Sequence, residues 1–517
     1  MPITDLRDST FVQDTLAHLL DPADLELVSQ VHPPDWTNPT PAGVYDLLVV
    51  GGGTAGLVSA MGAAGLGARV ALVERSLLGG DCLNTGCVPS KALLRSARAV
   101  ASPRKAASLG VTTGVPTADF AAVMSRMRAV RADISAHDSA ARLRQAGVDV
   151  FFGEGRFADR RTLAVAGHAI RFTRAVIATG ARAAVPSVPG LREVEYLTNE
   201  TLFRLTALPR RLLVVGGGPI GCEMAQAFAR FGSEVTIVDM APHLLPQEDV
   251  DAADIIERRF GAEGIRLELN ATLTRVERRG AETLLHVARQ CPNGSADAVE
   301  LAGDHVLVAV GRVPNIEHLG LDAAGVAFTT HGVTVDGRLR TTNSRVYAAG
   351  DVGSRFKFTH AADAMARTVI QNALFHGRKR ASSLVIPWCT YTDPEIAHVG
   401  DCSRDTEARG GRAETITVPL ADVDRAVLDD EAEGFVRVHH DRGRLLGCTI
   451  VAPHAGEMIG EACYALSHKG TLGQFSATIH PYPTQSEAFR MAGDRYRRAA
   501  LTPSVRRWLG RYFRWTR

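Results

Sequence analysis

Residues 45–56 read YDLLVVGGGTAG, and residues 68–74, after a run of small residues, read ARVALVE. An apolar strand, a glycine-rich turn, a helix and a second strand that ends in an acid form a complete dinucleotide-binding unit. The glycines let the backbone approach a pyrophosphate, and the acid accepts a hydrogen bond from a ribose hydroxyl. The residues concerned are Gly51, Gly53, Gly56 and Glu74. This stretch predicts an α/β domain.

The same pattern recurs in residues 211–221, RLLVVGGGPIG, and 234–239, EVTIVD. Its glycines and terminal acid are Gly216, Gly218, Gly221 and Asp239. Two complete units predict two dinucleotides, arranged so that one passes electrons to the other. A carboxylate at the end of the second strand bonds a ribose 2′-hydroxyl and repels a 2′-phosphate, and residues 240–243 contain no arginine. We therefore expect NAD(H) rather than NADP(H) at the second unit.

Between the two units, residues 79–91 read GGDCLNTGCVPSK. Gly79 and Gly80 allow a flat group to lie against the backbone, and Gly86 gives the turn between the two cysteines its freedom. A lysine one helical turn after the second cysteine favours a thiolate. The sequence predicts a redox-active dithiol of Cys82 and Cys87, with Lys91 beside it. The alternatives are a structural disulfide or a metal site, but metal sites normally need two close pairs of ligands.

Length and composition narrow the class of protein. A chain of 517 residues is long enough for two to four domains, and a net charge of +2 with 22% charged residues does not suggest a nucleic-acid partner. Eight cysteines in such a length do not form a secreted disulfide scaffold. Residues 1–20 lack the apolar core of a signal peptide, and no run of eighteen apolar residues occurs. We expect a cytoplasmic protein that does not span a membrane.

The remaining stretches complete the predicted organisation. Ser9 or Thr10 is expected to cap a short helix, Asp21-Pro22 to open a second, and residues 32–41 to form an extended linker. Further strands are expected in the two dinucleotide-binding parts and in a third, antiparallel domain that also has a helix over 457–467. Strand-turn runs are expected at 176–180 and 306–315, and residues 346–352 end a strand with a carboxylate at its tip. The strands of the third domain are expected at 383–387, 434–438 and 446–451.

The cysteine motif, both fingerprints, Gly350-Asp351 and the stretch PTQSE at 483–487, in this order, resemble the class I pyridine nucleotide–disulfide oxidoreductases. The resemblance covers roughly residues 45–500 and implies two Rossmann-like dinucleotide-binding domains plus a C-terminal α+β dimerisation domain. The implied parts are an N-terminal extension at 1–44, an FAD-binding domain at 45–189 and 313–383, an NAD(P)-binding domain at 190–312, a dimerisation domain at 384–500 and a basic amphipathic tail at 501–517.

The resemblance also implies the site residues. FAD is expected on Gly51, Gly53, Gly56, Glu74, Gly80, Lys91, Gly180 and Asp351, and the nicotinamide nucleotide on Gly216, Gly218, Gly221, Asp239 and Gly311. Cys87 is expected against the flavin, Cys82 as the interchange thiol that meets substrate, and Lys91 paired with Glu223. The family is a homodimer in which the C-terminal segment of one subunit completes the site of the other.

One departure from the family narrows the activity. Members that act on disulfides have a histidine directly before Pro-Thr, whereas this chain has Tyr482 there and keeps Glu487 five residues later. A tyrosine, whose pKa is near 10, is protonated at neutral pH and cannot take a thiol proton. Tyr482 argues against a dihydrolipoamide dehydrogenase, and mercuric reductases resemble this chain here. However, no cysteine follows Cys463, whereas mercuric reductases end in a vicinal cysteine pair.

With Tyr482 in this place, the resemblance implies a mercuric-reductase-like FAD enzyme that passes electrons from NADH to a soft metal ion or a thiol-reactive acceptor. The alternatives are a dihydrolipoamide dehydrogenase-like disulfide reductase and a membrane-associated flavoprotein that acts as redox sensor or electron donor. The remaining cysteines show no metal-ligand spacing, so we expect no metal site. Residues 503–517 predict a basic amphipathic helix, whose apolar side either docks on the chain's own third domain or contacts the inner membrane face.

Overall fold

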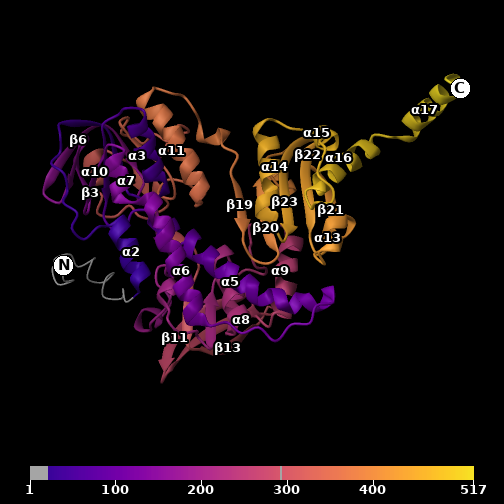
Figure 1. Cartoon of the computed structure of the whole chain (residues 1–517), viewed down its shortest axis with the longest axis horizontal. Helices are drawn as coiled ribbons and strands as arrows, with labels where there is room; N and C mark the ends of the chain where they lie inside the picture. Colours follow the sequence, from indigo (N-terminus) through magenta and orange to yellow (C-terminus); the bar gives the residue numbers. More distant parts are fainter. Residues whose placement is uncertain (1–20, 292–293) are drawn as a thin grey trace. The chain divides into compact units, whose positions relative to one another are not determined.

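The computed structural model of the chain describes residues 21–291 and 294–517. They fall into two compact units that are each discontinuous in sequence (Figure 1). Unit 1 takes in the described residues up to Ala101 together with Pro116–Pro242 and Gly264–Leu384, and unit 2 takes in Ser102–Val115, His243–Glu263 and Val385–Arg517. Both dinucleotide-binding parts belong to unit 1, and the boundary between them at residues 189–190 and 312–313 stays a prediction.

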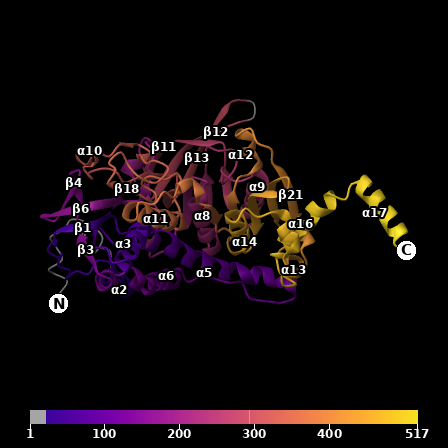
Figure 2. The same cartoon turned by 90° about the horizontal axis from the view of Figure 1, so that it is seen from above.

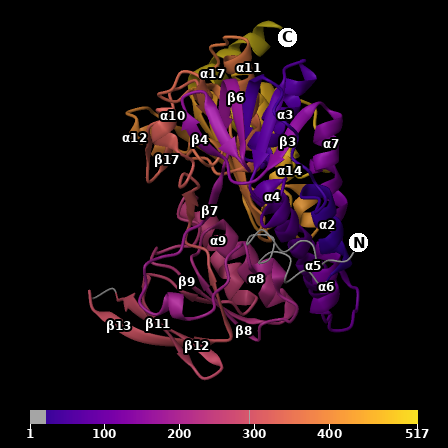
Figure 3. The same ribbon diagram turned by 90° about the vertical axis from the view of Figure 1, so that its left-hand side faces the viewer.

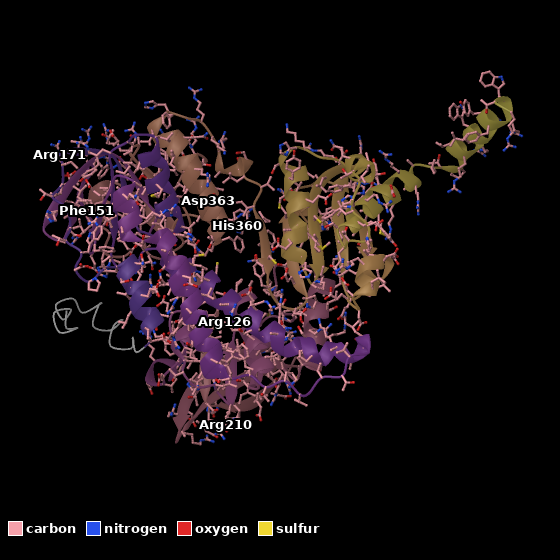
Figure 4. All side chains as sticks on the ribbon, in the orientation of Figure 1. Arg126, Phe151, Arg171, Arg210, His360 and Asp363 are labelled. Carbon is pink, nitrogen blue, oxygen red and sulfur yellow. The ribbon has the colours of Figure 1, made fainter. Side chains whose placement is uncertain are left out.

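The first sheet of unit 1 is parallel at its centre, as the fingerprint at residues 45–56 predicts. The strand order is β3-β2-β1-β6-β5-β4, with β18 beside β6. The strands are β1 (Val44–Val50), β2 (Val70–Glu74), β3 (Val148–Phe152), β4 (Arg156–Asp159), β5 (Thr162–Val165), β6 (His168–Ile177) and β18 (Val346–Ala348). The central strands are continuous apolar runs because both faces of the sheet are buried. Helix α3 (Thr54–Gly65) packs against α11 (Thr359–Leu374) beside this sheet (Figure 3), and Phe151, labelled in Figure 4, lies in its core.

The second parallel sheet of unit 1 repeats this arrangement on a smaller scale. Its order is β10-β9-β8-β14, and helix α8 (Pro219–Phe231) connects β8 to β9. These strands are β8 (Arg211–Val215), β9 (Glu234–Val238), β10 (Arg266–Glu268) and β14 (His305–Val308). A three-stranded antiparallel sheet of β11 (Ala271–Arg279), β12 (Glu282–Gln290) and β13 (Ala296–Gly303) precedes β14. The fold class predicted from the two fingerprints is confirmed.

The segment before the first strand packs on unit 1. Asp21 caps helix α2 (Pro22–Val31) by accepting a hydrogen bond from the Ala23 N–H at 2.9 Å, as Asp21-Pro22 predicts. The Asp24 carboxylate forms a buried ion pair with Arg131 of α6 (Phe120–Ser135), and the Trp36 indole donates to the Val150 carbonyl at 3.1 Å. The helix expected from Ser9 or Thr10 lies outside the described residues.

Unit 2 contains the antiparallel domain. Its five-stranded sheet has the order β19-β20-β23-β22-β21 and is covered by α14 (Ala455–Ser467) and α16 (Glu487–Ala499). The strands are β19 (Pro387–Thr390), β20 (Glu395–Gly400), β21 (Glu414–Pro419), β22 (Phe435–Asp441) and β23 (Arg444–Ala452). The strand predicted at 383–387 is wrong. Residues 381–383 form a 3₁₀ turn, and the edge strand begins at Pro387, which has no N–H to give to a ladder.

The tail of the chain forms a helix of its own, α17 (Pro503–Trp515), after α16 (Figure 2). Thr502 caps it and Pro503 occupies its first turn, as the sequence predicts. Of the helices in the described part of the chain, none has both the length and the apolar character to cross a membrane.

Candidate active site

The first fingerprint builds a cradle that only glycine can form. Gly51 has a φ of +108°, and a Cβ there would lie 2.4 Å from the Ala178 carbonyl oxygen; a Cβ on Gly56 would lie 1.8 Å from the Gly51 oxygen. Helix α3 starts after Gly53, which has no side chain to cap it, so its first N–H groups are left for an anion. Gly80 packs on Gly53, where a Cβ would come within 2.7 Å of the Gly53 Cα.

The acid at the end of β2 completes this cradle. Glu74 accepts hydrogen bonds from the Gly52 N–H at 2.5 Å and the Ser76 N–H at 2.7 Å, and burial raises the pKa of its carboxyl group. An uncapped helix start, three crowded glycines and an acid at the strand end are what FAD needs for its pyrophosphate and ribose. The residues present therefore fit FAD.

The second fingerprint has the same local geometry. A Cβ on Gly216 would lie 2.5 Å from the Ala309 oxygen, and one on Gly221 would lie 1.9 Å from the Gly216 oxygen. Asp239 directly follows β9, and its carboxylate accepts from the Gly217 N–H at 2.5 Å and the Ala241 N–H at 2.7 Å. Gly218 precedes α8 in the position that Gly53 has before α3. The residues fit a second dinucleotide.

The predicted dithiol lies where two helices meet. Cys82 is in α4 (Gly80–Asn84), and Cys87 is the first residue of α5 (Cys87–Ala106). The turn between them closes tightly, because a Cβ on Gly86 would lie 2.8 Å from the Asp81 oxygen. Both side chains are free thiols; Cys82 is half-buried and Cys87 is exposed. The position of Cys87 at a helix N-terminus favours its thiolate.

The pKa values of the two thiols are shifted in opposite directions. A hydrogen bond from Cys82 lowers the pKa of Cys87 to about 6, helped by the Thr359 hydroxyl at 3.4 Å and by the charge of Lys91. The same hydrogen bond, followed by burial, raises the pKa of Cys82. At neutral pH the reduced pair is therefore a Cys87 thiolate that accepts a hydrogen bond from the Cys82 thiol.

Lys91 links helix α5, which begins with Cys87, to helix α8 of the second fingerprint. Its Nζ lies 2.8 Å from Oε2 of Glu223, which is on α8 and only 4% exposed. The pairing that the family resemblance implies is present in the structure.

Asp81, next to Cys82, is held by Thr85 within the motif and by two distant residues that the sequence analysis missed, Asn199 and Arg312. The Asp81 carboxylate accepts from Asn199 at 2.8 Å and from Thr85 at 2.7 Å, and it forms an ion pair with Arg312 at 2.9 Å. Arg312 also lies 3.5 Å from Asp351. Burial raises the pKa of Asp351, and the positive charge of Arg312 only partly offsets this rise. The only sequence signal for Arg312 is its place directly after Gly311.

The predicted C-terminal site residues, Tyr482 and Glu487, lie in unit 2, where each bonds a different partner. The Tyr482 hydroxyl donates to Asp424 at 2.9 Å, and this bond raises its pKa, so it stays protonated. Glu487 forms an ion pair with Arg490. His480, two residues before Tyr482, is engaged by Glu461 at 2.9 Å. Of the other predicted glycines, Gly180 and Gly311 have φ angles of +67° and +129°.

One cluster was not anticipated from the sequence. His243, Asp254 and Glu257 offer ligand atoms that all lie within 4.8 Å of one another in unit 2. The Glu257 carboxylate also accepts a hydrogen bond from the Leu244 N–H at 2.8 Å, so it holds the backbone next to His243. The expectation that the chain has no metal site stays a prediction.

A pH titration of the thiols tests their assignment. In the reduced holoenzyme, the long-wavelength absorption of the Cys87 thiolate beside the flavin should rise through a midpoint near pH 6 and be lost below it, because only the thiolate gives this absorption. Cys82 should stay protonated over this range. Lys91→Gln should move the Cys87 midpoint upward, whereas Arg95→Gln, on an exposed position of the same helix, should not. A midpoint near the ordinary thiol value of about 8.5 would contradict the assignment.

Comparison with known proteins places the chain among relatives. Residues 45–366 match the family model described as pyridine nucleotide-disulphide oxidoreductase, and residues 386–492 match that of its dimerisation domain. The mercuric reductase of Bacillus cereus is 34% identical over 451 residues, which are 87% of this chain and 71% of that protein. The dihydrolipoyl dehydrogenase of Bacillus subtilis is 31% identical over 462 residues, 86% of this chain and 96% of that protein.

Solved structures agree with these sequence relatives. The HOCl-induced flavoprotein disulfide reductase from Escherichia coli is 28% identical, with a TM-score of 0.76 over 87% of this chain and 99% of that chain. A Cu(II) complex of the same reductase superposes with the same TM-score over 86% of this chain and 98% of that one. LpdA from Mycobacterium tuberculosis is 30% identical, with a TM-score of 0.78 over 87% of this chain and 99% of that one.

Proposed function

Because this chain belongs to the pyridine nucleotide-disulphide oxidoreductases, we propose that it is a mercuric-reductase-like enzyme that oxidises NADH and delivers the electrons to a soft metal ion or another thiol-reactive acceptor. The family is flavin-dependent and uses a pyridine nucleotide. FAD, when bound, supplies the route by which an electron pair passes between the nicotinamide and the cysteine pair. We further propose a cytoplasmic homodimer, which the matched dimerisation domain supports.

The roles of the protein's own residues follow from their protonation. NADH provides two electrons, which break the Cys82–Cys87 disulfide and leave a thiolate on Cys87 and a thiol on Cys82. Cys82 is then the thiol that binds the acceptor and releases its proton as the sulfur–metal bond forms. One Hg(II) accepts both electrons and leaves as Hg(0), whereas Cu(II) accepts one electron per ion. The ion pair of Lys91 with Glu223 ties the helix that carries Cys87 to helix α8 of the second dinucleotide-binding fingerprint.

The observation that carries the choice of acceptor is the state of Tyr482. Its hydroxyl already donates to Asp424 and has a raised pKa, so it cannot accept the proton of a dithiol substrate. The loss of a positioned base typically costs about 10²–10⁴-fold in rate. Reduction of a thiol-bound metal ion needs no such base. A solved relative that is a Cu(II) complex supports metal ions as acceptors.

An acceptor panel tests this function. We expect purified holoenzyme to oxidise NADH with Hg(II) or Cu(II) at least about 10²-fold faster than with lipoamide, the lower end of the effect of a missing base. Glutathione disulfide and a quinone complete the panel. A lipoamide rate equal to the metal rate would favour the dihydrolipoamide dehydrogenase alternative. If no small acceptor is turned over, the protein is instead a redox sensor or a dedicated electron donor.

Coenzyme choice gives a separate prediction. We expect kcat/KM for NADH to exceed that for NADPH by about 100-fold, because a 2′-phosphate placed against the Asp239 carboxylate costs several kcal/mol. Steady-state kinetics of Asp239→Asn should narrow this ratio, and Glu234→Gln, an exposed change at the start of the same strand, should leave it unchanged. A wild-type ratio near one would contradict the role of Asp239.

A further inference from the structure

The end of the chain forms a helix whose apolar face is left exposed by the rest of the described chain. Helix α17 (Pro503–Trp515) has no buried residue among its thirteen, all of which the structure describes. Its large apolar side chains are exposed by 38% for Val505, 64% for Trp508, 46% for Tyr512, 55% for Phe513 and 84% for Trp515. Figure 4 shows the side chains of α17 standing clear of the other elements of unit 2. The expectation that this face docks on the chain's own third domain is therefore wrong.

A helix of this length needs a partner. Isolated helices shorter than about 12–15 residues are marginal in water, and in proteins an amphipathic helix is held mainly by burial of its apolar face. Thr502 caps α17 and Pro503 fixes its first turn, so the sequence prepares the helix. The rings of Trp508 and Tyr512 stack with centroids 6.1 Å apart, which leaves a continuous aromatic surface without cover.

The charge of the tail is one-sided. After Asp494 the chain contains no acidic residue, and it contains eight arginines: Arg495, Arg497, Arg498, Arg506, Arg507, Arg511, Arg514 and Arg517. The other 494 residues carry 50 of the 58 basic residues and all 56 acidic ones, so without the tail the chain is net acidic. At about 100° per residue, the four arginines within α17 (Arg506, Arg507, Arg511 and Arg514) lie opposite the aromatic face. None of the α17 arginines forms an ion pair within the described chain.

We propose that α17 docks the enzyme on an anionic membrane surface, with its aromatic face in the boundary between headgroups and acyl chains and its arginines on lipid phosphates. A membrane satisfies both faces of the helix at once, since tryptophan and tyrosine prefer this boundary and arginine pairs with phosphate. Symmetric pairing of two α17 helices would instead gather their arginines without acidic partners. A groove on another protein would cover the aromatic face but leave the arginines at a solvated rim, where each contributes little.

The proposal goes beyond the electron-transfer chemistry and does not depend on the acceptor. In the homodimer, two tails would meet the same surface, so the second contact becomes intramolecular and avidity strengthens the binding. An enzyme held in this way would reduce acceptors as they arrive at the membrane.

Vesicle co-sedimentation of the holoenzyme tests the proposal. The probes are vesicles of phosphatidylcholine alone and vesicles in which about a third of the lipid is phosphatidylglycerol. We expect binding only to the anionic vesicles, a blue shift of tryptophan fluorescence on binding, and loss of binding between about 0.1 M and about 1 M salt, where the Debye length falls from about 10 to about 3 Å. Truncation after Ala500 should abolish binding and leave NADH oxidation unchanged.

Point variants separate the two faces of the helix. The triple change Arg507→Gln, Arg511→Gln and Arg514→Gln should weaken vesicle binding at least about 100-fold, whereas the same positions changed to lysine should keep it within about 3-fold, because the charge remains. Trp508→Ala with Trp515→Ala should weaken it at least about 30-fold, and the matched change of both to phenylalanine should largely restore it.

Three results would overturn the proposal. The first is equal binding to neutral vesicles, and the second is binding by the truncated chain. The third is an absence of vesicle binding together with a tail-dependent increase in oligomeric mass, which would assign the aromatic face to a second copy of the chain.

Discussion

Replacing Cys82 with serine is expected to lower turnover of the acceptor by at least about 10³-fold, the scale on which a reacting nucleophile contributes to a rate. A serine hydroxyl can still donate a hydrogen bond to Cys87, so the fold and the Cys87 thiolate should persist while the sulfur that binds the acceptor is gone. Cys87→Ser should be equally severe, because the disulfide that stores the electron pair can no longer form. Acceptor-dependent NADH oxidation by each purified holoenzyme measures the effect.

The control for this prediction is Cys291→Ser. Cys291 is a partly exposed thiol outside the motif, with its Sγ 3.2 Å from the Asp297 carboxylate, and its replacement should leave turnover within about 2-fold. If Cys82→Ser kept turnover within about 10-fold of the parent, electrons would leave the enzyme without passing through the dithiol. That outcome would favour the alternative of a flavoprotein electron donor.

The second large effect is expected from Gly56→Ala. The added Cβ would lie 1.8 Å from the backbone oxygen of Gly51, and because both atoms belong to the backbone frame, neither can swing away. Overpacking typically lowers the free energy of unfolding by about 1–3 kcal/mol, and we expect this contact to cost at least the upper value. At about 2–4 °C per kcal/mol for a domain of this size, the melting temperature should fall by roughly 6–12 °C, and the purified protein should contain less flavin.

Gly65→Ala is the matched control, since it lies at the other end of the same helix, α3. Apart from its two chain neighbours and the backbone of its own helix, no described atom lies within 4 Å of the added Cβ, and alanine is the better helix former by up to about 1 kcal/mol. This variant should keep its flavin and melt at or slightly above the parent temperature. Equal losses in the two variants would mean that the crowding at Gly51 does not define the cradle.

Sequence alone determined the parts of this protein whose requirements are local. A strand that turns through glycine into a helix must bring backbone atoms into contact, and Gly51 with Gly56 shows that no other residue fits there. The second fingerprint is predictable for the same reason, as are the dithiol and the caps of α2 and α17. The local pattern failed at the edge of the antiparallel sheet. A strand was expected at 383–387, but residues 381–383 form a 3₁₀ turn and the edge strand begins only at Pro387.

Only the tertiary structure decided which distant side chains bond the residues of the dithiol motif. Asn199 and Arg312 reach Asp81 from far along the chain, Thr359 reaches Cys87 from α11, and no spacing rule connects them. Tyr482 was identified from its place before Pro-Thr, but its bond to Asp424 comes from another element of unit 2. Amphipathicity predicted helix α17, whereas only the packed structure left its apolar face uncovered. Hydrogen bonds and burial depend on which surfaces meet in space, and the order of residues specifies that only through the complete fold.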